Sequence, residues 1–289
     1  MARRRRKFTL VGSDGKRNRV ILIIIAAVVV VAVLIGTLQP EPLIFSSPEI
    51  HIIQNRGVVL AGVRSDMPGF GSGGAGLEIE LATLLAERIL PDVKHGDAVK
   101  FVNVNHQSIW PTLSDGSIDF AICLMEKDAD TKGRYIYSEP YYYDACYLAV
   151  QEGSADLALN EGVIVGYVSN TASHRALQRY INSLKEAGKP ADWKTQAFAS
   201  YPDMLFALNA ARIDAAAIEG AYARRYQDDE HYGFTLKQEA VGTISYAIAC
   251  STESQAICEL ANMLLEDMRK DGSLDALINK HGLSASPKG

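Results

Sequence analysis

Two charged residues stand where strands are expected to end, and that position favours contact with a small ligand. Arg64 follows the apolar segment 58–63, and Glu219 follows the apolar segment 213–218. In open α/β sheets the carboxyl ends of the strands face the crevice in which ligands bind. A guanidinium binds a carboxylate through paired hydrogen bonds, and a carboxylate accepts from an ammonium. The pair predicts a site for a small charged molecule. A solvated Arg64, and a Glu219 that favours the dipole of the next helix, remain simpler readings.

A third candidate lies at the start of an expected helix. The segment Asn-Thr-Ala-Ser (170–173) precedes helical spacing over 174–187. Its hydroxyls and the unpaired backbone N–H groups of a helix start are typical of an anion site. Helix capping alone would also explain Ser173.

The glycine-rich segment 71–76 reads GSGGAG and matches the dinucleotide-binding pattern G-x-G-x-x-G. That pattern requires its first glycine directly after a strand, and here residues 64–70 intervene. The next expected strand also ends in Asn-Val-Asn (103–105) and lacks the acid that would bind a ribose. We therefore interpret 71–76 as a flexible turn. Histidines show no paired ligand spacing, and we expect no cofactor and no metal.

Strand and helix patterns alternate along the body of the chain and then repeat, which predicts an α/β fold in two halves. The first half has expected strands at 58–63, 100–105 and 118–124, with helices at 77–90 and 107–114. The second has strands at 163–166, 195–199 and 213–218, with helices at 174–187, 204–210 and 220–227. The halves join near 143–150 and again near 241–250. The helices at 254–271 and 273–280, the latter capped by Ser273 and stopped by Gly282, return to the first half. Two lobes with two crossings predict a hinged cleft.

The N-terminal part differs from the body. Residues 1–19 carry eight basic residues and one acid, so the other 270 carry a formal charge of −12 within a total of −5. An acidic body argues against a nucleic-acid partner. The 19 residues of 20–38 contain no charge and are long enough to span a bilayer. We expect a transmembrane signal-anchor with residues 1–19 in the cytoplasm, followed by a proline-containing linker over 39–49. A cleaved signal peptide is the alternative, and either places the body outside the cytoplasm.

Four cysteines would then lie in a compartment where disulfides persist. Cys250 and Cys258 are close enough in the chain to pair across a strand-to-helix turn, although the sequence leaves the connectivity open. Cys123 and Cys146 are interpreted as small buried hydrophobic residues.

The ordered motifs of the body resemble the family of extracellular solute-binding proteins for polar amino acids, the receptors of ABC importers. The matching strings are GVRSDMPGFG (62–71), GLEIELATLLAERI (76–89), LSDGSIDFAI (113–122), YSEPYYYD (137–144), VGYVSNTAS (165–173), RIDAAAIE (212–219) and MRKDGSLDALINKHG (268–282). The resemblance implies a two-lobed, type II periplasmic-binding-protein-like fold. Lobe 1 would comprise 50–145 and 246–289, and lobe 2 would comprise 146–245.

The resemblance also implies roles for individual residues. Arg64 and Phe70 would belong to the rim of lobe 1, with Arg64 as in binders of acidic amino acids. Thr171 would contact the ligand from lobe 2, and Glu219 replaces the usual Asp that holds the α-ammonium. The ligand-binding loop of lobe 1 would contribute Cys123, Leu124 and Glu126.

Two departures from the family pattern affect the expected ligand. Thr131 stands where the family has the arginine that binds the α-carboxylate, so Arg134 or Lys132 would have to replace it. Glu126 stands where a small hydroxyl residue is usual, and its charge would repel a carboxylate unless Arg64, Lys132 or Arg134 offsets it. We expect an amino acid, with an acidic one as the more specific expectation. A cationic amine matched by Glu126 and Glu219 is the alternative.

The sequence thus predicts a membrane-tethered extracytoplasmic receptor that delivers a small polar solute to an ABC permease, without catalysis. One alternative is an enzyme, because the fold resembles that of cyclohexadienyl dehydratases, with Glu126 or Glu219 as a general acid. A degenerate ligand-sensing domain is the other alternative.

Overall fold

The computed structural model describes residues 47–105, 108–127, 133–154, 156, 159, 162–189, 192–227, 229 and 231–284. The expected cytoplasmic tail and transmembrane segment 20–38 lie outside these residues, as do Thr131 and Lys132. Within the described part of the chain, every helix is too short or too polar to cross a bilayer.

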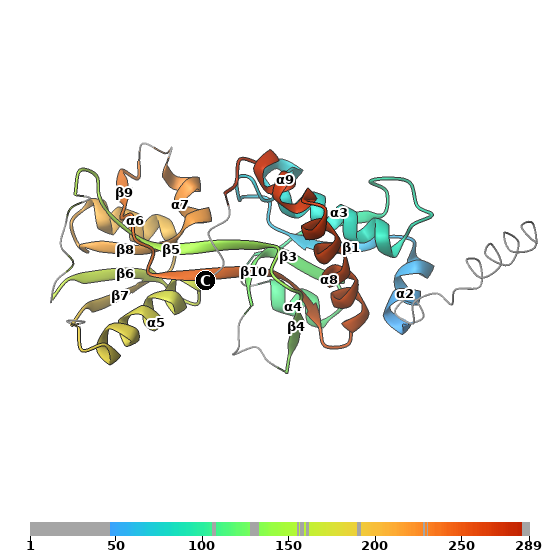
Figure 1. Cartoon of the computed structure of the whole chain (residues 1–289), viewed down its shortest axis with the longest axis horizontal. Coiled ribbons are helices and arrows are strands. Elements are labelled where there is room, and N and C mark those ends of the chain that lie inside the picture. The colour runs from blue at the N-terminus through green and yellow to red at the C-terminus, as the bar shows by residue number, and fades with distance from the viewer. Residues whose placement is uncertain are drawn as a thin grey trace, which may run out of the picture. The chain divides into compact units, whose positions relative to one another are not determined.

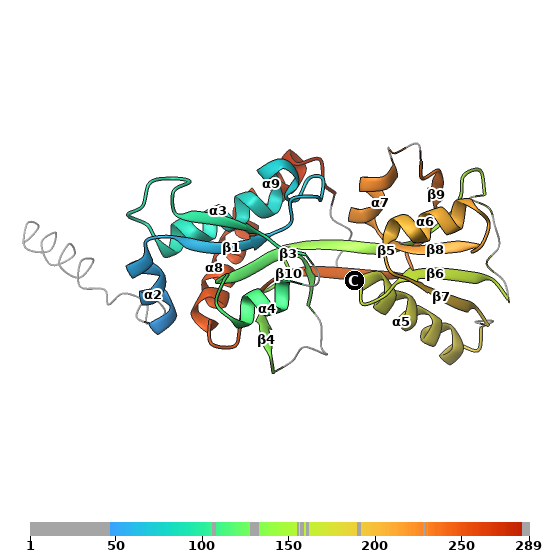
Figure 2. The same ribbon diagram turned by 180° about the vertical axis from the view of Figure 1, so that it is seen from behind.

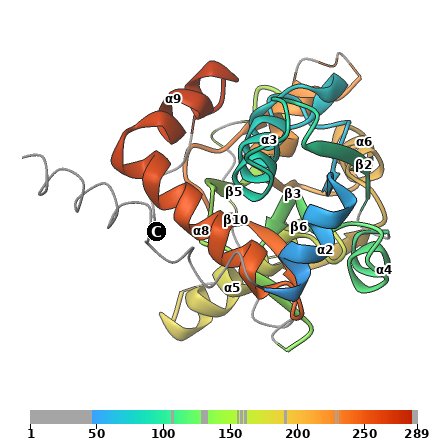
Figure 3. The ribbon, with the colours of Figure 1, turned by 90° about the vertical axis from the view of Figure 1, so that its right-hand side faces the viewer.

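Lobe 1 is a parallel three-stranded sheet covered by helices. Its elements are α2 (Pro48–Arg56), β1 (Val59–Val63), the short 3-10 helix η2 (Ser72–Gly74), α3 (Leu77–Ile89), β2 (Val99–Asn103), α4 (Ile109–Ser114), β3 (Phe120–Glu126), β4 (Tyr135–Tyr137), α8 (Gln255–Lys270) and α9 (Ser273–Lys280). β1 lies between β2 and β3 and pairs with both in parallel. The apolar face of α3 packs against β1 and α8, and Figure 3 shows α8 across the end of this lobe.

Lobe 2 repeats the pattern with its own parallel strands. Its elements are β6 (Ile164–Val168), α5 (Ala172–Glu186), β7 (Lys194–Phe198), α6 (Tyr201–Asn209), β8 (Ala215–Glu219), α7 (Gly220–Gln227) and β9 (Phe234–Leu236). β6 pairs in parallel with both β7 and β8. Arg64 comes directly after β1, and Glu219 is the last residue of β8, as the sequence predicts.

Two ten-residue strands, β5 (Tyr142–Gln151) and β10 (Gly242–Ser251), connect the lobes (Figures 1 and 2). The first part of β5 pairs antiparallel with β10, and its second part pairs with β8 of lobe 2. β10 in turn pairs with β3 of lobe 1. Both expected lobe boundaries, 145/146 and 245/246, therefore fall inside continuous strands rather than in loops.

Several local expectations are wrong. The expected linker 39–49 overlaps α2, because Pro48 occupies the first helical turn, where its missing N–H costs no hydrogen bond. Gly272, with φ 78°, occupies the cap position expected for Ser273. The expected cap at Ser173 is instead Thr171, whose side chain accepts from the His174 N–H. The cysteines are all free and buried, so the possible bridge between Cys250 and Cys258 is not formed.

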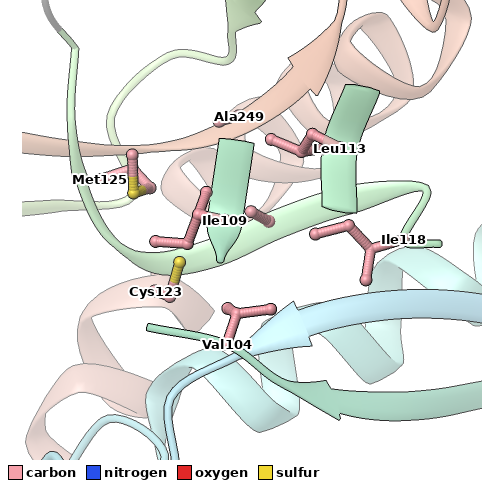
Figure 4. Close-up of a cluster of buried hydrophobic side chains, with 8 residues drawn as sticks. Val104, Ile109, Leu113, Ile118, Cys123, Met125 and Ala249 are labelled. Carbon is pink, nitrogen blue, oxygen red and sulfur yellow. The ribbon is translucent and has the colours of Figure 1, made fainter. Parts of the chain in front are cut away.

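The predicted ligand loop at Cys123, Leu124 and Glu126 is also wrong in its local structure, because these residues lie on β3. Cys123 is fully buried in a hydrophobic cluster of lobe 1 with Val104 and Ile109 (Figure 4). Leu124 has φ 58°, and the pairing of β3 with β10 shifts register between Ala247 and Ala249. Ala121, Cys123 and Met125 belong to this cluster and Leu124 does not, so the side chains of β3 still alternate between its two faces.

Candidate functional site

A cavity of about 730 Å³ lies between the two lobes. Lobe 1 contributes Arg64, Asp66 and Glu126 to its wall, and lobe 2 contributes Arg175, Glu219 and Arg225. The volume is within the range of small-molecule sites. Arg64 and Glu219, the two residues from which the sequence predicts a site, therefore share one cavity.

Arg64 is buried and reaches toward lobe 2. Its Nε donates to Asp66 Oδ1 at 2.9 Å and its Nη2 to Asp66 Oδ2 at 2.8 Å. Its Nη1 donates to the hydroxyl of Tyr222 on α7, and the guanidinium lies 5.3 Å from the centre of that ring. Burial lowers the pKa of Arg64, but Asp66 and Tyr222 outweigh it and raise the pKa above its usual value. Arg64 is a fixed cation.

Asp66 binds a second guanidinium, because Arg225 of α7 also donates to its Oδ2. Burial raises the pKa of Asp66, but the bonds from Arg64 and Arg225 lower it well below its usual range. Two arginines therefore share the carboxylate of Asp66. Asp66 and Arg225 also join the two lobes directly.

Glu219 is almost completely buried, with 2% exposure. Its Oε1 accepts from the Ser173 N–H at 2.9 Å, and its Oε2 accepts from the Tyr201 hydroxyl. Burial raises the pKa of Glu219, and those two bonds oppose the rise. Because a carboxylate has about four acceptor positions, Glu219 keeps the capacity to accept from a cation in the cavity.

Thr171 also lines the cavity, at the start of α5. Its hydroxyl accepts from the His174 N–H at 3.3 Å, lies 2.7 Å from the Val168 carbonyl and lies 3.0 Å from Ser173 Oγ. The capping interpretation therefore holds for Thr171, and its contact with a ligand stays a prediction.

Glu126 is paired with arginines of the opposite lobe. Its Oε2 lies 2.6 Å from Arg175 Nε and 2.5 Å from Arg175 Nη2, and its Oε1 lies 3.2 Å from Arg179 Nη2. The expectation that Arg64, Lys132 or Arg134 must offset Glu126 is thus wrong for Arg64 and Arg134. Arg134 is exposed and lies outside the cavity wall, whereas α5 presents Arg175 and Arg179 on one face.

Phe70 and Cys123 are not at the cavity wall. Phe70 is fully buried and packs edge-on against Tyr142, with 5.2 Å between ring centres. Cys123 points into the lobe 1 core (Figure 4). Leu124 lines the cavity, but its N–H donates to Glu78 Oε1 at 2.7 Å and is directed inward. Of the eight predicted site residues, the cavity collects Arg64, Leu124, Glu126, Thr171 and Glu219.

Aromatic rings make up much of the remaining wall, and the sequence analysis missed them. They are Trp110, Tyr137, Tyr201, Tyr222, Tyr226 and Tyr246. Tyr201 and Tyr222 stack with 4.2 Å between ring centres. Their positions at the starts of two helices that follow strands of lobe 2 were the available signal. Such rings favour the apolar part of a ligand or its cationic group.

The glycine-rich segment forms a turn against the site. A Cβ added to Gly71 would lie 2.1 Å from the carbonyl oxygen of Arg64. Gly71 thus allows close approach to the backbone that carries Arg64, which is a packing role. Within the described residues, side chains that could hold a metal ion form no cluster of three.

Comparison with known proteins identifies the family. Residues 61–284 match the sequence pattern of the bacterial extracellular solute-binding proteins, family 3. The chain belongs to this family. The probable histidine-binding protein of Campylobacter jejuni is 22% identical over 194 residues, which cover 66% of this chain and 72% of that protein. The L-cystine-binding protein TcyJ of Escherichia coli K12 is 22% identical over 242 residues, with 80% and 85% covered.

Solved structures share the fold of this chain. The P235GK mutant of the protein ArgBP from T. maritima superimposes with a TM-score of 0.62 at 24% identity, over 80% of this chain and 98% of that one. The two-lobed α/β periplasmic-binding-protein fold expected from the sequence is confirmed. As a member of an extracellular family, the chain has its solute-binding body outside the cytoplasm.

Proposed function

We propose that this chain is the binding component of an ABC importer and that it binds an amino acid in the cavity between its lobes. The observation that carries the proposal is that Arg64 and Glu219, at the ends of β1 and β8, line one cavity from opposite lobes. Relatives named for binding histidine and cystine support this ligand class. Closure of the lobes around the solute would present a joint surface to the permease.

The roles of the two residues follow from their charges. Glu219 accepts from the α-ammonium, because it faces the cavity and has acceptor capacity left. The guanidiniums of Arg64 and Arg225, which share one carboxylate, attract a carboxylate of the ligand. An acidic amino acid is therefore the more specific proposal. A cationic amine is the less favoured ligand, because Glu126 is already paired with Arg175 and Arg179.

We further propose that residues 20–38 anchor the protein in the membrane, with residues 1–19 on the cytoplasmic side. Support comes from the uncharged length of 19 residues and from the basic cluster before it. Protease treatment of intact cells tests the arrangement. Cleavage of the body but not of an epitope at the N-terminus is expected, and protection of both would contradict it.

Binding is tested by isothermal titration of the full chain, purified in a mild detergent, against the twenty amino acids and a set of polyamines. We expect heat with at least one amino acid and a dissociation constant near the micromolar range, about −8 kcal/mol. Heat of binding with polyamines alone would show that the ligand is a cationic amine and not an amino acid. Heat with none would reject the proposal.

One observation favours a dehydratase-like enzyme as the second candidate, namely the raised pKa of the buried Glu219, which suits a general acid. Turnover of prephenate-like acids would support this alternative. We expect none, since both oxygens of Glu219 accept bonds that hold the carboxylate in place.

A further inference from the structure

Arg175 places a further guanidinium at the cavity wall. It lies in the first turn of α5, and its side chain is 27% exposed. Its Nε and Nη2 both lie close to one oxygen of Glu126, across the cavity on β3. The guanidinium of this lobe 2 residue is therefore directed toward lobe 1 and already binds a carboxylate there.

Arg175 lies on the same helix start that contacts the proposed ammonium partner. The Ser173 N–H donates to Glu219 at 2.9 Å, and Arg175 is two residues further along the same helical turn. An α-amino acid carries its ammonium and its α-carboxylate on one carbon. Partners for the two groups must therefore lie within reach of one ligand, and Glu219 and Arg175 both line the cavity.

Glu126 can release Arg175 without losing all of its partners. Its second oxygen lies 3.2 Å from Nη2 of Arg179, one helical turn further along α5. Arg179 is 58% exposed and lies outside the cavity wall, so a ligand does not compete for it directly.

We propose that Arg175 binds the α-carboxylate of the ligand and that Glu126 competes with the ligand for this guanidinium. The proposal rests on the proposed amino-acid binding. It assigns the carboxylate contact to lobe 2, beside Glu219, and it makes Glu126 a resident competitor that sets affinity. Arg64 and Arg225, which share Asp66, line the same cavity and would face a side-chain group of the ligand.

The test compares the amino acid that binds best to the wild-type chain with its α-amide, which keeps the ammonium but lacks the carboxylate charge. Titrations use the full chain in detergent and the variants Arg175→Ala, Glu126→Gln, Arg179→Ala and Arg212→Ala. We expect Arg175→Ala to raise the dissociation constant of the amino acid by about 10- to 100-fold and that of the α-amide by less than about 3-fold. Arg179→Ala removes the second arginine from Glu126 and should weaken binding of the amino acid by leaving Glu126 more firmly on Arg175. Arg212→Ala is the matched control, since Arg212 is exposed and lies outside the cavity wall, and it should change either affinity by less than about 3-fold.

Glu126→Gln distinguishes a Glu126 that competes with the ligand from a Glu126 that only holds the two lobes together through Arg175. If Glu126 competes with the ligand, Glu126→Gln should lower the dissociation constant of the amino acid by about 3- to 10-fold, which is opposite in sign to the effect of Arg175→Ala. If the pair only holds the lobes together, both variants break the same contact and both weaken amino acid and α-amide alike, which would overturn the proposal. Arg175→Lys, which keeps the charge, replaces Arg175→Ala if the latter does not fold, and is expected to retain part of the preference for the amino acid.

The two proposals fail in different ways. A wild-type chain that binds no amino acid rejects the proposed function, and this inference with it. A wild-type chain that binds an amino acid and loses nothing with Arg175→Ala rejects the role of Arg175 alone.

Discussion

Glu219→Gln changes the charge at the centre of the site with little change in shape. In the wild-type chain the carboxylate accepts from the Ser173 N–H and the Tyr201 hydroxyl. The Gln carbonyl can keep the bond from Ser173, and a rotated Tyr201 hydroxyl can accept from the Gln amide. We therefore expect the fold to survive, with a loss of about 1 kcal/mol in the free energy of unfolding.

The effect on binding should be much larger. A hydrogen bond between charged groups contributes about 1.5–3 kcal/mol, which corresponds to roughly 10- to 150-fold in the dissociation constant. The raised pKa of Glu219 adds a pH signature, because burial favours the protonated form, which cannot accept a bond from an ammonium as a carboxylate does. Wild-type affinity should fall as pH is lowered through that pKa, whereas the Gln variant should lack this dependence.

Isothermal titration at several pH values, with thermal unfolding in parallel, measures both effects. Glu239→Gln is the matched control, since Glu239 is exposed and this variant changes the net charge of the chain by the same amount as Glu219→Gln. A folded Glu219→Gln chain with wild-type affinity would show that Glu219 does not hold the ligand.

Three further predictions concern residues around the cavity. Arg64→Ala should raise the dissociation constant of an acidic amino acid by about 10-fold or more, and that of its uncharged amide analogue far less, as measured by titration. Equal losses of affinity would show that Arg64 acts through the fold alone. Burial raises the pKa of Glu78 from the usual 4.5 to about 7. The protonated side chain therefore stabilises the fold fully below about pH 4.5. This stabilisation, about 3 kcal/mol, is lost as pH rises through 7. Urea unfolding should therefore find Glu78→Gln more stable relative to wild type at pH 8 than at pH 5, and a pH-independent difference would contradict this. Gly71→Ala should cost about 1–3 kcal/mol and lower the unfolding temperature, because its Cβ would meet the Arg64 carbonyl at 2.1 Å; an unchanged temperature would argue against the close contact.

Much of the fold was predictable because hydrophobic periodicity marks each element. The expected helices at 220–227 and 273–280 match α7 and α9 in both bounds. Strand ends were also informative. Ligands bind at the carboxyl ends of parallel strands, and this rule predicted that Arg64 and Glu219 line one cavity although they lie far apart in the sequence.

Contacts across the cavity were not predictable in the same way. Glu126 and Arg175 are 49 residues apart and lie on different lobes, and no local pattern relates them. The misplacement of Cys123 has a local cause. β3 is apolar and buried on both faces from Phe120 to Met125, so the sequence did not reveal which side chain faces the cavity. Phe70 could not be placed either, because a rim residue and a core residue have the same apolar character.

A crystal structure of the chain with the best-binding amino acid tests the central claim most directly. The account predicts ligand density in the cavity of about 730 Å³, with the ammonium within hydrogen-bond distance of Glu219 and a carboxylate at an arginine of the wall. A ligand bound elsewhere, or one in the cavity that leaves Glu219 without contact to its ammonium, would contradict it.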